Sequence, residues 1–559
     1  MSPRPLAWVL ACSLLAATAF GQGHGTPDGP VQLPPRWHSG DTHVHTQPCG
    51  PGPLLDPGEL VQQQLTAGVN IACASFWNPS KTLEGQQTYF TTLVPQIDGM
   101  LHVASRPSLG AILQFGVEVS GFNSSQFGHV CGIGITDGVF PNLEYPGADL
   151  EFFLAQPGAI AGYSHVRWPL GYQSMSGPQL AHLVPAMLPI DAALGAATFI
   201  EAYHFDAFDA LDWRGIYYKL QNAGVRVALV AGTDNTCIYP LLGPIRTYVG
   251  TSDFTPDFDR WVDGVRAGCT SISTDGSVFL AIAVDKTVAG RTLHISGGAQ
   301  VLPRVHVKKT PGGALSGTLE LIYNGAVVAT SAAALPVGGE QVWEPVFVPT
   351  ESGWLAASLD GIAHTAAIYV IVDGQPIGST ADAQYLRQHC DQLVAPPPPF
   401  VVGASAAAIA ERVTAARDIY DALALLEAPP VGVARYGVST EACDGPIAIG
   451  LTGPAIAGQT IGVTCVHAPP GVFGVLAIGS DADQAAIDLL GASIYLDPLS
   501  PYNVDPVASN KGGYARRDYP LTPELVGQSL HMQFVWINPA SCATAGLLSS
   551  SDALVATVQ

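Results

Sequence analysis

The stretch RWHSGDTHVHT, residues 36–46, is where the organisation of the N-terminal half first becomes apparent. The stretch is predicted to be extended, with His43 and His45 near the end of a strand. Alternate residues of a strand face the same side of a sheet, so both imidazoles are expected to point into one place. A lone strand-end histidine is more often structural, but two that converge are a moderate indication of a metal site.

Strand-like and helix-like segments alternate outward from this stretch as far as about residue 270. Asp56 is expected to cap a helix that begins at Pro57 and ends near Gly68. Two further helices are predicted to end at Gly224 and Gly268. The strand-like runs between helices include AILQFGVEV, HVCGIGI, AIAGYSHV, ATFIEAYHF and VRVALVAGTD. This alternation predicts a parallel sheet with helices outside it.

Residue types that bind metal ions recur at the ends of these predicted strands, where α/β barrels gather their active sites. Taken singly, each has a structural explanation, such as a helix cap for an aspartate or a buried, paired carboxylate for a glutamate. As an ordered set they predict one or two divalent ions, and zinc, manganese and iron all suit such ligands. The candidate ligands are His43, His45, Glu118, His129, His165 and Asp234.

The motifs GDTHVHT, GVEVS, GHVCGIG, SHV and GTDN, in this order, resemble the polymerase and histidinol phosphatase (PHP) superfamily. More narrowly, they resemble the CehA/McbA-like metallohydrolases. The resemblance covers residues 36–395 and implies a distorted (β/α)7 barrel. It also implies two metal sites that share one bridging carboxylate. The first site would consist of His43, His45, Glu118 and Asp234, and the second of Glu118, His129 and His165.

The superfamily's full pattern contains a third metal site, and this sequence departs from it. Phe76-Trp77-Asn78 stands in place of an Asp-His pair, and Thr236 stands in place of a histidine after Asp234. We therefore expect a mono- or dinuclear centre. Trp77 and Asn78 are expected to shape the substrate pocket.

Several polar residues near the ligand motifs are further candidates for the site. Arg167 and Arg246 are candidate substrate-binding residues, because arginine clamps phosphate or carboxylate groups, although a structural role is the commoner one. Glu201 and His204 are expected to support the ligands by hydrogen bonds. Glu118 and Asp234 are the expected catalytic residues.

Such a centre predicts water-dependent hydrolysis of an ester-like bond in a small molecule, either a phosphoester or a carboxyl or carbamate ester. The alternative is a catalytically degenerate barrel that serves as an extracellular binding or surface module. The missing third site favours that alternative, and the six retained ligands oppose it. The sequence has no G-x-S-x-G, H-E-x-x-H or P-loop motif that would indicate another chemistry.

The rest of the chain is predicted to be mostly β. Residues 276–395 are expected to form a β-sandwich extension, and 396–430 a proline-rich spacer and a helix. Residues 435–559 are expected to form a C-terminal β-sandwich domain, and its resemblance to domains appended to many secreted bacterial proteins implies binding or surface attachment at most. Two of the three cysteines in this domain are expected to pair. These cysteines are Cys443, Cys465 and Cys542.

Composition and the N-terminus indicate where the protein works. With a formal net charge of −22 and only 23 Lys plus Arg, the chain is a poor candidate for nucleic-acid binding. Residues 1–22 are expected to be a signal peptide, since the apolar run 6–20 is too short to span a bilayer comfortably. A lipid anchor at Cys12 is the less favoured alternative. No later segment resembles a transmembrane helix, so we expect a secreted, periplasmic or cell-surface protein.

Overall fold

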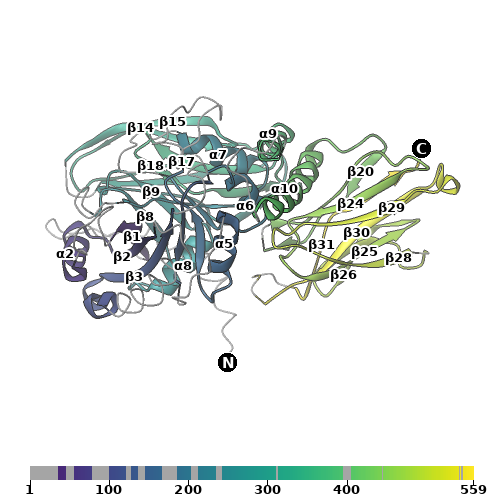
Figure 1. The fold of residues 1–559 in the computed structure, drawn as a ribbon. Helices are drawn as coiled ribbons and strands as arrows, with labels where there is room; N and C mark the ends of the chain where they lie inside the picture. Colours follow the sequence, from purple (N-terminus) through teal and green to yellow (C-terminus); the bar gives the residue numbers. More distant parts are fainter. Residues whose placement is uncertain are drawn as a thin grey trace.

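The computed structural model is mostly β. Helices pack on the N-terminal half, and further helices lie between that half and the C-terminal domain (Figure 1). Within the described residues, no helix combines the length and apolar character needed to cross a membrane. The predicted signal peptide lies outside the described residues. These residues are 36–45, 56–78, 100–120, 127–135, 145–166, 185–202, 212–234, 242–309, 313–394, 405–443, 445–500, 502–540, 542 and 546–559.

Seven strands follow one another in chain order in one curled sheet. Adjacent strands are parallel except at β4, which is antiparallel to both neighbours. The prediction of a parallel sheet is therefore wrong for β4. Residues 120–129, which join β3 to β4, are too few for the crossover that a parallel pair requires. The strands are β1 (Trp37–His45), β2 (Ile71–Asn78), β3 (Ile112–Val119), β4 (Val130–Ile133), β5 (Ile160–Tyr163), β6 (Phe199–Glu201) and β7 (Ala228–Val230).

The sheet curls back on itself without closing along its whole length. The first half of β1 pairs with β8 (Arg246–Gly250), which occupies the edge that a closed barrel would give to β7. Only the second half of β1 meets the segment after β7, where the Asp234 N–H donates to the His43 carbonyl at 2.8 Å. The structure thus shows a β-rich, curled sheet, and the finer assignment to a PHP-type barrel stays a prediction.

Helices pack outside this sheet, and the predicted caps are confirmed. The carboxylate of Asp56 accepts a hydrogen bond from the Gly58 N–H at the start of α2, and Gly68 ends that helix with φ 68°. Helix α8 buries Trp261, Val262 and Val265. The helices are α2 (Pro57–Ala67), η2 (Pro107–Leu109), α5 (Pro146–Leu154), α6 (Leu188–Ala193), α7 (Asp212–Asn222) and α8 (Phe258–Arg266).

The extension is a two-layered β structure, as predicted, but one layer continues the N-terminal sheet through β9 (Thr270–Ser273) and β18 (Ala363–Thr365). Apolar side chains such as Leu280, Val305 and Leu355 fill the space between the layers. The continuous layer adds β12 (Thr292–Ile295), β14 (Leu315–Tyr323), β15 (Ala326–Leu335), β17 (Gly353–Leu359) and β19 (Ile368–Val372). The second layer contains β10 (Val278–Val284), β11 (Thr287–Val288), β13 (Pro303–Lys309) and β16 (Glu340–Trp343).

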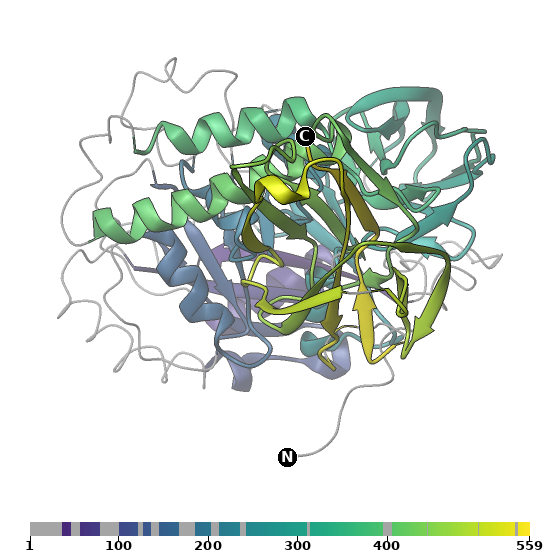
Figure 2. The ribbon, with the colours of Figure 1, turned by 90° about the vertical axis from the view of Figure 1, so that its right-hand side faces the viewer.

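Two helices, α9 (Thr380–Asp391) and α10 (Ser405–Glu427), lie side by side between the N-terminal half and the C-terminal domain (Figures 1 and 2). The predicted apolar face of α10 is buried. Arg412 on α10 also pairs with Asp191 on α6 and Glu151 on α5. Helix α10 is therefore packed into the N-terminal half and is more than a spacer. The buried face consists of Ile409, Val413, Ala416, Ile419 and Leu423.

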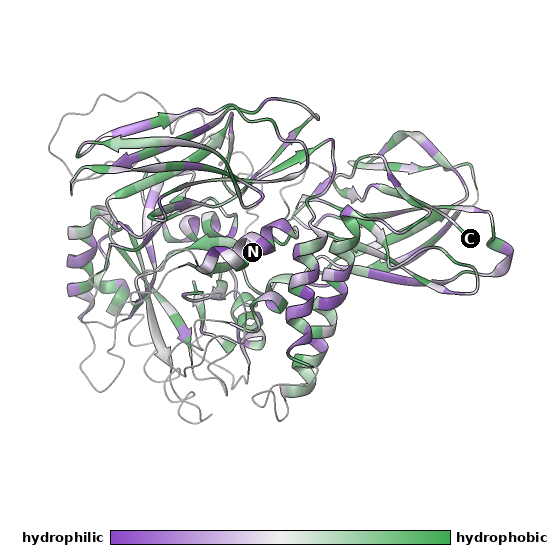
Figure 3. Cartoon of the chain, turned by 90° about the horizontal axis from the view of Figure 1, so that it is seen from above, coloured by the Kyte–Doolittle hydropathy of each residue, from purple (hydrophilic) through white to green (hydrophobic). Residues whose placement is uncertain are grey.

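The C-terminal domain consists of two main sheets around an apolar core that includes Ile449, Phe534 and Trp536. Apolar residues are spread along the strands of this domain and of the extension (Figure 3). Cys443 pairs with Cys542, and Cys465 is a buried free thiol.

The larger sheet contains β20 (Val433–Tyr436), β25 (Phe473–Gly479), β28 (Tyr502–Ala508), β30 (Ser529–Ile537), β31 (Leu548–Ser550) and β32 (Ala553–Thr557). The second contains β23 (Ala448–Leu451), β24 (Thr460–Val466) and β29 (Ala515–Pro520). The remaining elements are β21 (Glu441–Ala442), β22 (Gly445–Pro446), β26 (Ala482–Leu489), β27 (Ala492–Leu496) and η5 (Pro523–Leu525).

Candidate metal centre

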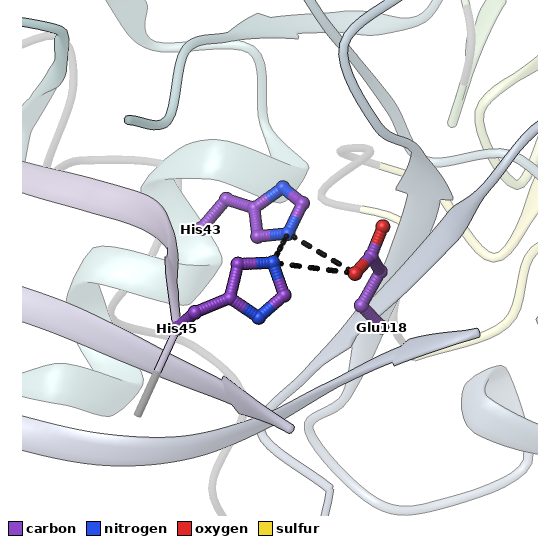
Figure 4. A group of neighbouring side chains, drawn as sticks. All are labelled: His43, His45 and Glu118. Carbon is purple, nitrogen blue, oxygen red and sulfur yellow. Dashed lines mark hydrogen bonds and ion pairs between the residues drawn. The ribbon is translucent and has the colours of Figure 1, made fainter. Parts of the chain in front are cut away.

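His43 and His45 lie at the end of β1, and both side chains are buried and turned toward Glu118 on β3 (Figure 4). The two Nε2 atoms are 3.2 Å apart. Oε2 of Glu118 lies 3.6 Å from Nε2 of His43 and 3.3 Å from Nε2 of His45. The prediction that both imidazoles face one place is confirmed, and with Glu118 they form a group that can hold a metal ion.

The other oxygen of Glu118 faces a second pair of histidines. Oε1 lies 2.6 Å from Nδ1 of His129 and 3.6 Å from Nε2 of His165. These three residues form a second group that can hold a metal ion. The carboxylate of Glu118 therefore lies between two histidine pairs, in the position that the resemblance assigned to a bridging ligand.

The direction of β4 explains how His129 joins this cluster. Glu118 stands near the C-terminal end of β3, and His165 follows the C-terminal end of β5. His129 instead precedes β4. Because β4 runs antiparallel to both neighbours, its beginning lies at the same edge of the sheet as their ends.

Asp234 reaches both histidine groups from the segment after β7. Its Oδ1 lies 2.8 Å from Nε2 of His45 and 3.4 Å from Nε2 of His43. Its Oδ2 lies 3.9 Å from Nε2 of His165. The structure thus brings all six predicted ligands together, while their role in binding a metal stays a prediction.

Two residues of the cluster have left-handed backbone conformations, which are uncommon outside glycine. The φ angles are 33° at His165 and 47° at Asp234. Hydrogen bonds hold both turns, because the His165 N–H donates to Glu201 and the Asp234 N–H donates to the His43 carbonyl. Such conformations cost about 1–3 kcal/mol each and gather at functional sites.

Glu201, at the end of β6, positions the ligands from behind. Its Oε1 lies 3.1 Å from Nδ1 of His43 and accepts the His165 N–H at 3.2 Å, and its Oε2 accepts the Thr42 hydroxyl at 2.8 Å. A proton on Nδ1 that donates to Glu201 leaves the Nε2 lone pair of His43 facing the cluster. The supporting role expected of Glu201 therefore has a structural basis, while His204 lies outside the described residues.

Opposite charges inside the cluster shift the pKa values of its members. Burial alone would raise the pKa of Glu118, but His129 and His43 hold it well below its ordinary value. Burial alone would lower the pKa of His43, but Cys131 and the surrounding carboxylates raise it well above its ordinary value. The carboxylates thus favour positive charge at this place, and protons compete there with any metal ion.

Two residues that the sequence reasoning missed lie directly behind the ligands. Asp41 is buried and accepts the N–H groups of His43 at 3.1 Å and Thr233 at 2.9 Å, together with the Thr233 hydroxyl. The Cys131 sulfur lies 3.9 Å from Nδ1 of His43 and accepts the Ser164 hydroxyl. Asp41 had a signal in the sequence, because it alternates with His43 and His45 on the predicted strand.

For those predicted substrate-binding residues that are described, the structure shows contacts with the backbone and none with a ligand site. The buried Arg246 donates from Nε to the Gly243 carbonyl at 2.6 Å and from a terminal nitrogen to the Ala67 carbonyl at 3.2 Å. These contacts are structural, and substrate binding by Arg246 has no contact to support it. The backbone of Trp77 pairs with Glu118 across β2 and β3, and that of Asn78 pairs with Val119. Arg167 lies outside the described residues.

No family model and no curated protein matches this sequence. Among solved structures, the CARDB domain of the PF1109 protein from Pyrococcus furiosus, in complex with di-metal ions, is 17% identical. That match covers 17% of this chain and 86% of that chain, with a TM-score of 0.15. A red sea bream transglutaminase is 9% identical over 51% of this chain and 31% of that chain, with a TM-score of 0.14.

The secreted serine protease VesC from Vibrio cholerae is 12% identical, covering 49% of this chain and 51% of that chain, with a TM-score of 0.17. This chain thus spans about a third of the transglutaminase and half of the protease. Likenesses with such low TM-scores carry no argument about fold or function. What the geometry itself establishes is a buried histidine and carboxylate cluster that can hold a metal ion.

Proposed function

We propose that the protein is a metal-dependent hydrolase that acts on an ester-like bond through a mono- or dinuclear centre. The observation that carries this proposal is the position of Glu118, whose two oxygens face two different histidine pairs. Support also comes from Asp234, which faces members of both pairs.

The chemistry of the donor set fits a divalent ion. All potential ligand atoms are imidazole nitrogens or carboxylate oxygens, which suit zinc, manganese or iron. His43 and His45 would hold one ion with Glu118 and Asp234, and His129 and His165 would hold a second with Glu118. When bound, such ions supply Lewis acidity and lower the pKa of water toward neutrality.

The chain's own residues would orient the reactants and move the proton. Glu201 fixes the ring of His43 through Nδ1, so the orientation of that imidazole is set before any ligand arrives. The carboxylate of Asp234 lies beside both histidine groups, where it would accept a proton from water and return it to the leaving group. The target is a small phosphoester, or a carboxyl or carbamate ester.

A purely structural explanation of the cluster is costly. Burying carboxylates and imidazoles is unfavourable unless each is paired, and apolar side chains of similar volume often serve stability equally well. The two left-handed backbone turns at His165 and Asp234 add further cost. This combination supports a functional cluster, and the hydrolase proposal assigns that function.

The proposals about family, export and surface attachment rest on the sequence motifs. We infer membership of the PHP superfamily and export by the N-terminal segment, with the C-terminal domain as the means of surface attachment. The five resembling motifs supply all six clustered residues, which supports the family assignment. N-terminal sequencing of the exported protein would test the predicted cleavage near residues 19–22.

The first experiment is metal analysis of the purified protein, followed by assays with p-nitrophenyl phosphate, a bis-phosphodiester, an acetate and a carbamate. We expect one or two metal equivalents and turnover of at least one ester. Glu118→Gln should lose at least one equivalent and reduce turnover by roughly 100-fold or more. Glu320→Gln, whose carboxylate accepts the Ser358 hydroxyl in the extension, is the matched control.

The possible results distinguish a hydrolase from the alternative, a catalytically degenerate binding module. Protein that takes up neither zinc nor manganese would contradict both the metal centre and the hydrolase. Metal binding without turnover of any ester would favour a degenerate binding module, an interpretation also supported by the sequence at Trp77 and Thr236. Unchanged turnover in Glu118→Gln would rule out the shared carboxylate.

A further inference from the structure

Three side chains connect helix α10 to the strand that precedes His165. Arg412 on α10 donates to Oδ1 of Asp191 on α6, from Nε at 3.1 Å and from a terminal nitrogen at 2.5 Å. The other carboxylate oxygen of Asp191 accepts the Tyr163 hydroxyl at 2.5 Å. Tyr163 is the last residue of β5 and stands two residues before His165. These contacts therefore run from α10 to the second histidine pair of the candidate metal centre.

Tyr163 lies beside the backbone of both histidines of that pair, His129 and His165. Its ring is close to Gly128, where an added Cβ atom would be 3.5 Å from Cδ1 of the tyrosine. Immediately after the tyrosine, the Ser164 N–H donates to the His129 carbonyl at 3.1 Å. The position of Tyr163 thus affects the segment that carries each histidine.

The backbone next to this tyrosine has left-handed conformations on both segments. The φ angle is 33° at His165 and 83° at Gly128. A non-glycine residue keeps such a conformation only where the surrounding structure imposes it. Glu201 holds the His165 turn by accepting its N–H, and the turn begins directly after the anchored strand end at Tyr163. Anchoring of the tyrosine therefore restrains where this turn starts.

Burial of the three connecting side chains indicates a positioning role. Tyr163 and Asp191 are fully buried, and the side chain of Arg412 is 11% exposed. Buried charge pairs often stabilise a protein no more than apolar side chains of similar volume, and their best-attested use is to specify one arrangement. Helices α10 and α6 lie side by side (Figure 1). The three residues thus fix α10, α6 and β5 relative to one another.

The first histidine pair, His43 and His45, is held by a different part of the chain. Glu201 lies 3.1 Å from Nδ1 of His43, and Asp41 accepts the His43 N–H at 3.1 Å. Both supporting residues belong to the curled sheet itself. The two pairs therefore have separate supports, and a change at one support should affect mainly its own pair.

We propose that Tyr163, Asp191 and Arg412 are positioning residues for the second histidine pair, so that helix α10 is part of the candidate metal centre. The inference rests on the proposed function, and specifically on a second ion held by His129 and His165. Without the tyrosine hydroxyl, β5 loses its bond to α6, and the two imidazoles are held less firmly in one geometry. The second ion should then bind more weakly, while the first ion is unaffected.

Titration of the metal-free, full-length protein with zinc, in competition with a chelator, tests this assignment. Wild-type protein should take up two equivalents. Tyr163→Phe keeps the ring beside Gly128 and removes only the hydroxyl. This variant should weaken the second equivalent by roughly tenfold and change the first by less than about twofold, since residues that support metal ligands contribute roughly 10–100-fold in affinity.

Tyr420→Phe is the matched control. The buried Tyr420 hydroxyl also bonds to α6, where the Pro189 carbonyl accepts it at 2.6 Å. The variant loses the same chemical group, but its contact is with α6 rather than with β5. It should lower stability and leave both zinc affinities unchanged. Equal weakening of the second ion in Tyr163→Phe and Tyr420→Phe would overturn the proposal, and so would unchanged zinc binding in Tyr163→Phe.

Hydrogen exchange of the metal-free protein gives a readout that is independent of the hydrolase proposal. The Ser164 N–H, which is bonded to the His129 carbonyl, should exchange several-fold faster in Tyr163→Phe than in the wild type. The Asp234 N–H, which is bonded to the His43 carbonyl, should exchange at an unchanged rate. If wild-type protein binds fewer than two ions, the dinuclear centre is wrong and exchange alone decides this inference. Unchanged exchange at Ser164 would overturn it.

Arg412→Gln combined with Asp191→Asn tests the contribution of α10. Removing both charges together avoids a buried carboxylate without a partner, which would be strongly destabilising. We expect a smaller loss at the second equivalent than in Tyr163→Phe, because an asparagine oxygen can still accept the tyrosine hydroxyl. Arg417→Gln, which removes a partly exposed arginine of α10 that pairs with Asp391, is its control. Zinc binding that is the same in these two variants would show that α10 has no part in the centre.

Discussion

The candidate metal centre and a cavity of about 430 Å³ lie toward opposite ends of the same two strands, β6 and β7, and are built in different ways. The ligands of the centre are mostly buried, and its carboxylates and histidines contact one another. The cavity is open at a rim, and Arg226, Arg266 and Lys511 are among the residues that line it. The centre is thus built from ligands that contact one another, whereas the cavity brings together side chains from separate parts of the chain.

The difference extends to how each site is encoded. The residues of the centre fall in short motifs at strand ends within one part of the chain. The cations of the cavity come from three parts and are up to 285 residues apart, from Arg226 to Lys511. Changes that disturb local geometry should therefore damage the centre most, and changes that remove single charges should affect the cavity mildly.

The largest effect is expected from Gly232→Ala, beside the centre. A Cβ atom there would lie 2.6 Å from Cβ of His43 and 2.7 Å from Oε2 of Glu201. Overpacking of this kind costs about 1–3 kcal/mol and should also displace His43, so we expect reduced stability together with loss of metal. Urea unfolding and metal analysis measure the two effects.

Gly453→Ala is the matched control, because a Cβ atom at that glycine would meet nothing within 4 Å. Equal stability and equal metal content in the two variants would mean that the approach of Gly232 to His43 is unimportant.

The next effect is expected from Glu201→Gln, which keeps the shape of the side chain but removes its charge. Residues that hold metal-binding histidines in place typically contribute roughly 10–100-fold in metal affinity. We expect a loss of that size, measured by competition with a chelator, and little change in the melting temperature. Full metal affinity in this variant would show that His43 is positioned by the backbone alone.

A smaller effect concerns Asp149 on α5, a buried carboxyl group without the charged neighbours that Glu118 has. Neither of its oxygens has a hydrogen-bond partner among the described residues, and burial raises its pKa well above the ordinary value of 3.8. The unfolded chain releases this proton near pH 3.8, but the folded chain retains it. The contribution of Asp149 to stability is therefore complete below that pH and is lost as pH rises toward the folded pKa.

The slope of that loss is about 1.4 kcal/mol per pH unit for one proton. Asp149→Asn should remove it, so the stability difference between variant and wild type should grow as pH rises above about 4. Urea unfolding at several pH values measures this difference. Asp259→Asn, an exposed aspartate on α8, should show no such growth, and a flat difference for Asp149→Asn would mean that Asp149 ionises in the folded protein.

The smallest effect is expected from Lys511→Gln at the rim of the cavity. Its ammonium group is 71% exposed and pairs with Glu151, and exposed ion pairs contribute roughly 0.2–1 kcal/mol. We expect the free energy of unfolding to fall by at most about 1 kcal/mol, measured by urea unfolding. A loss of several kcal/mol would show that the pair of Lys511 with Glu151 contributes more than an exposed ion pair does.

The sequence by itself determined the features that depend on near neighbours along the chain. Asp56 and Gly68 bound helix α2 because a cap and a left-handed turn need only a few residues. His43 and His45 face one place because strands alternate, and the buried face of α10 follows from helical periodicity. Residues at strand ends could be gathered into one cluster because adjacent strands share an edge.

Only the tertiary structure decided features that depend on strand direction and on distant partners. The sequence did not specify that β4 is antiparallel, which is what brings His129 to Glu118. It left Arg246 as a candidate for substrate binding beside the commoner structural role, and the structure shows its guanidinium donating to the backbone carbonyls of Gly243 and Ala67. The cavity has no motif in the sequence, because the residues that line it come from separate parts of the chain that only the fold brings together.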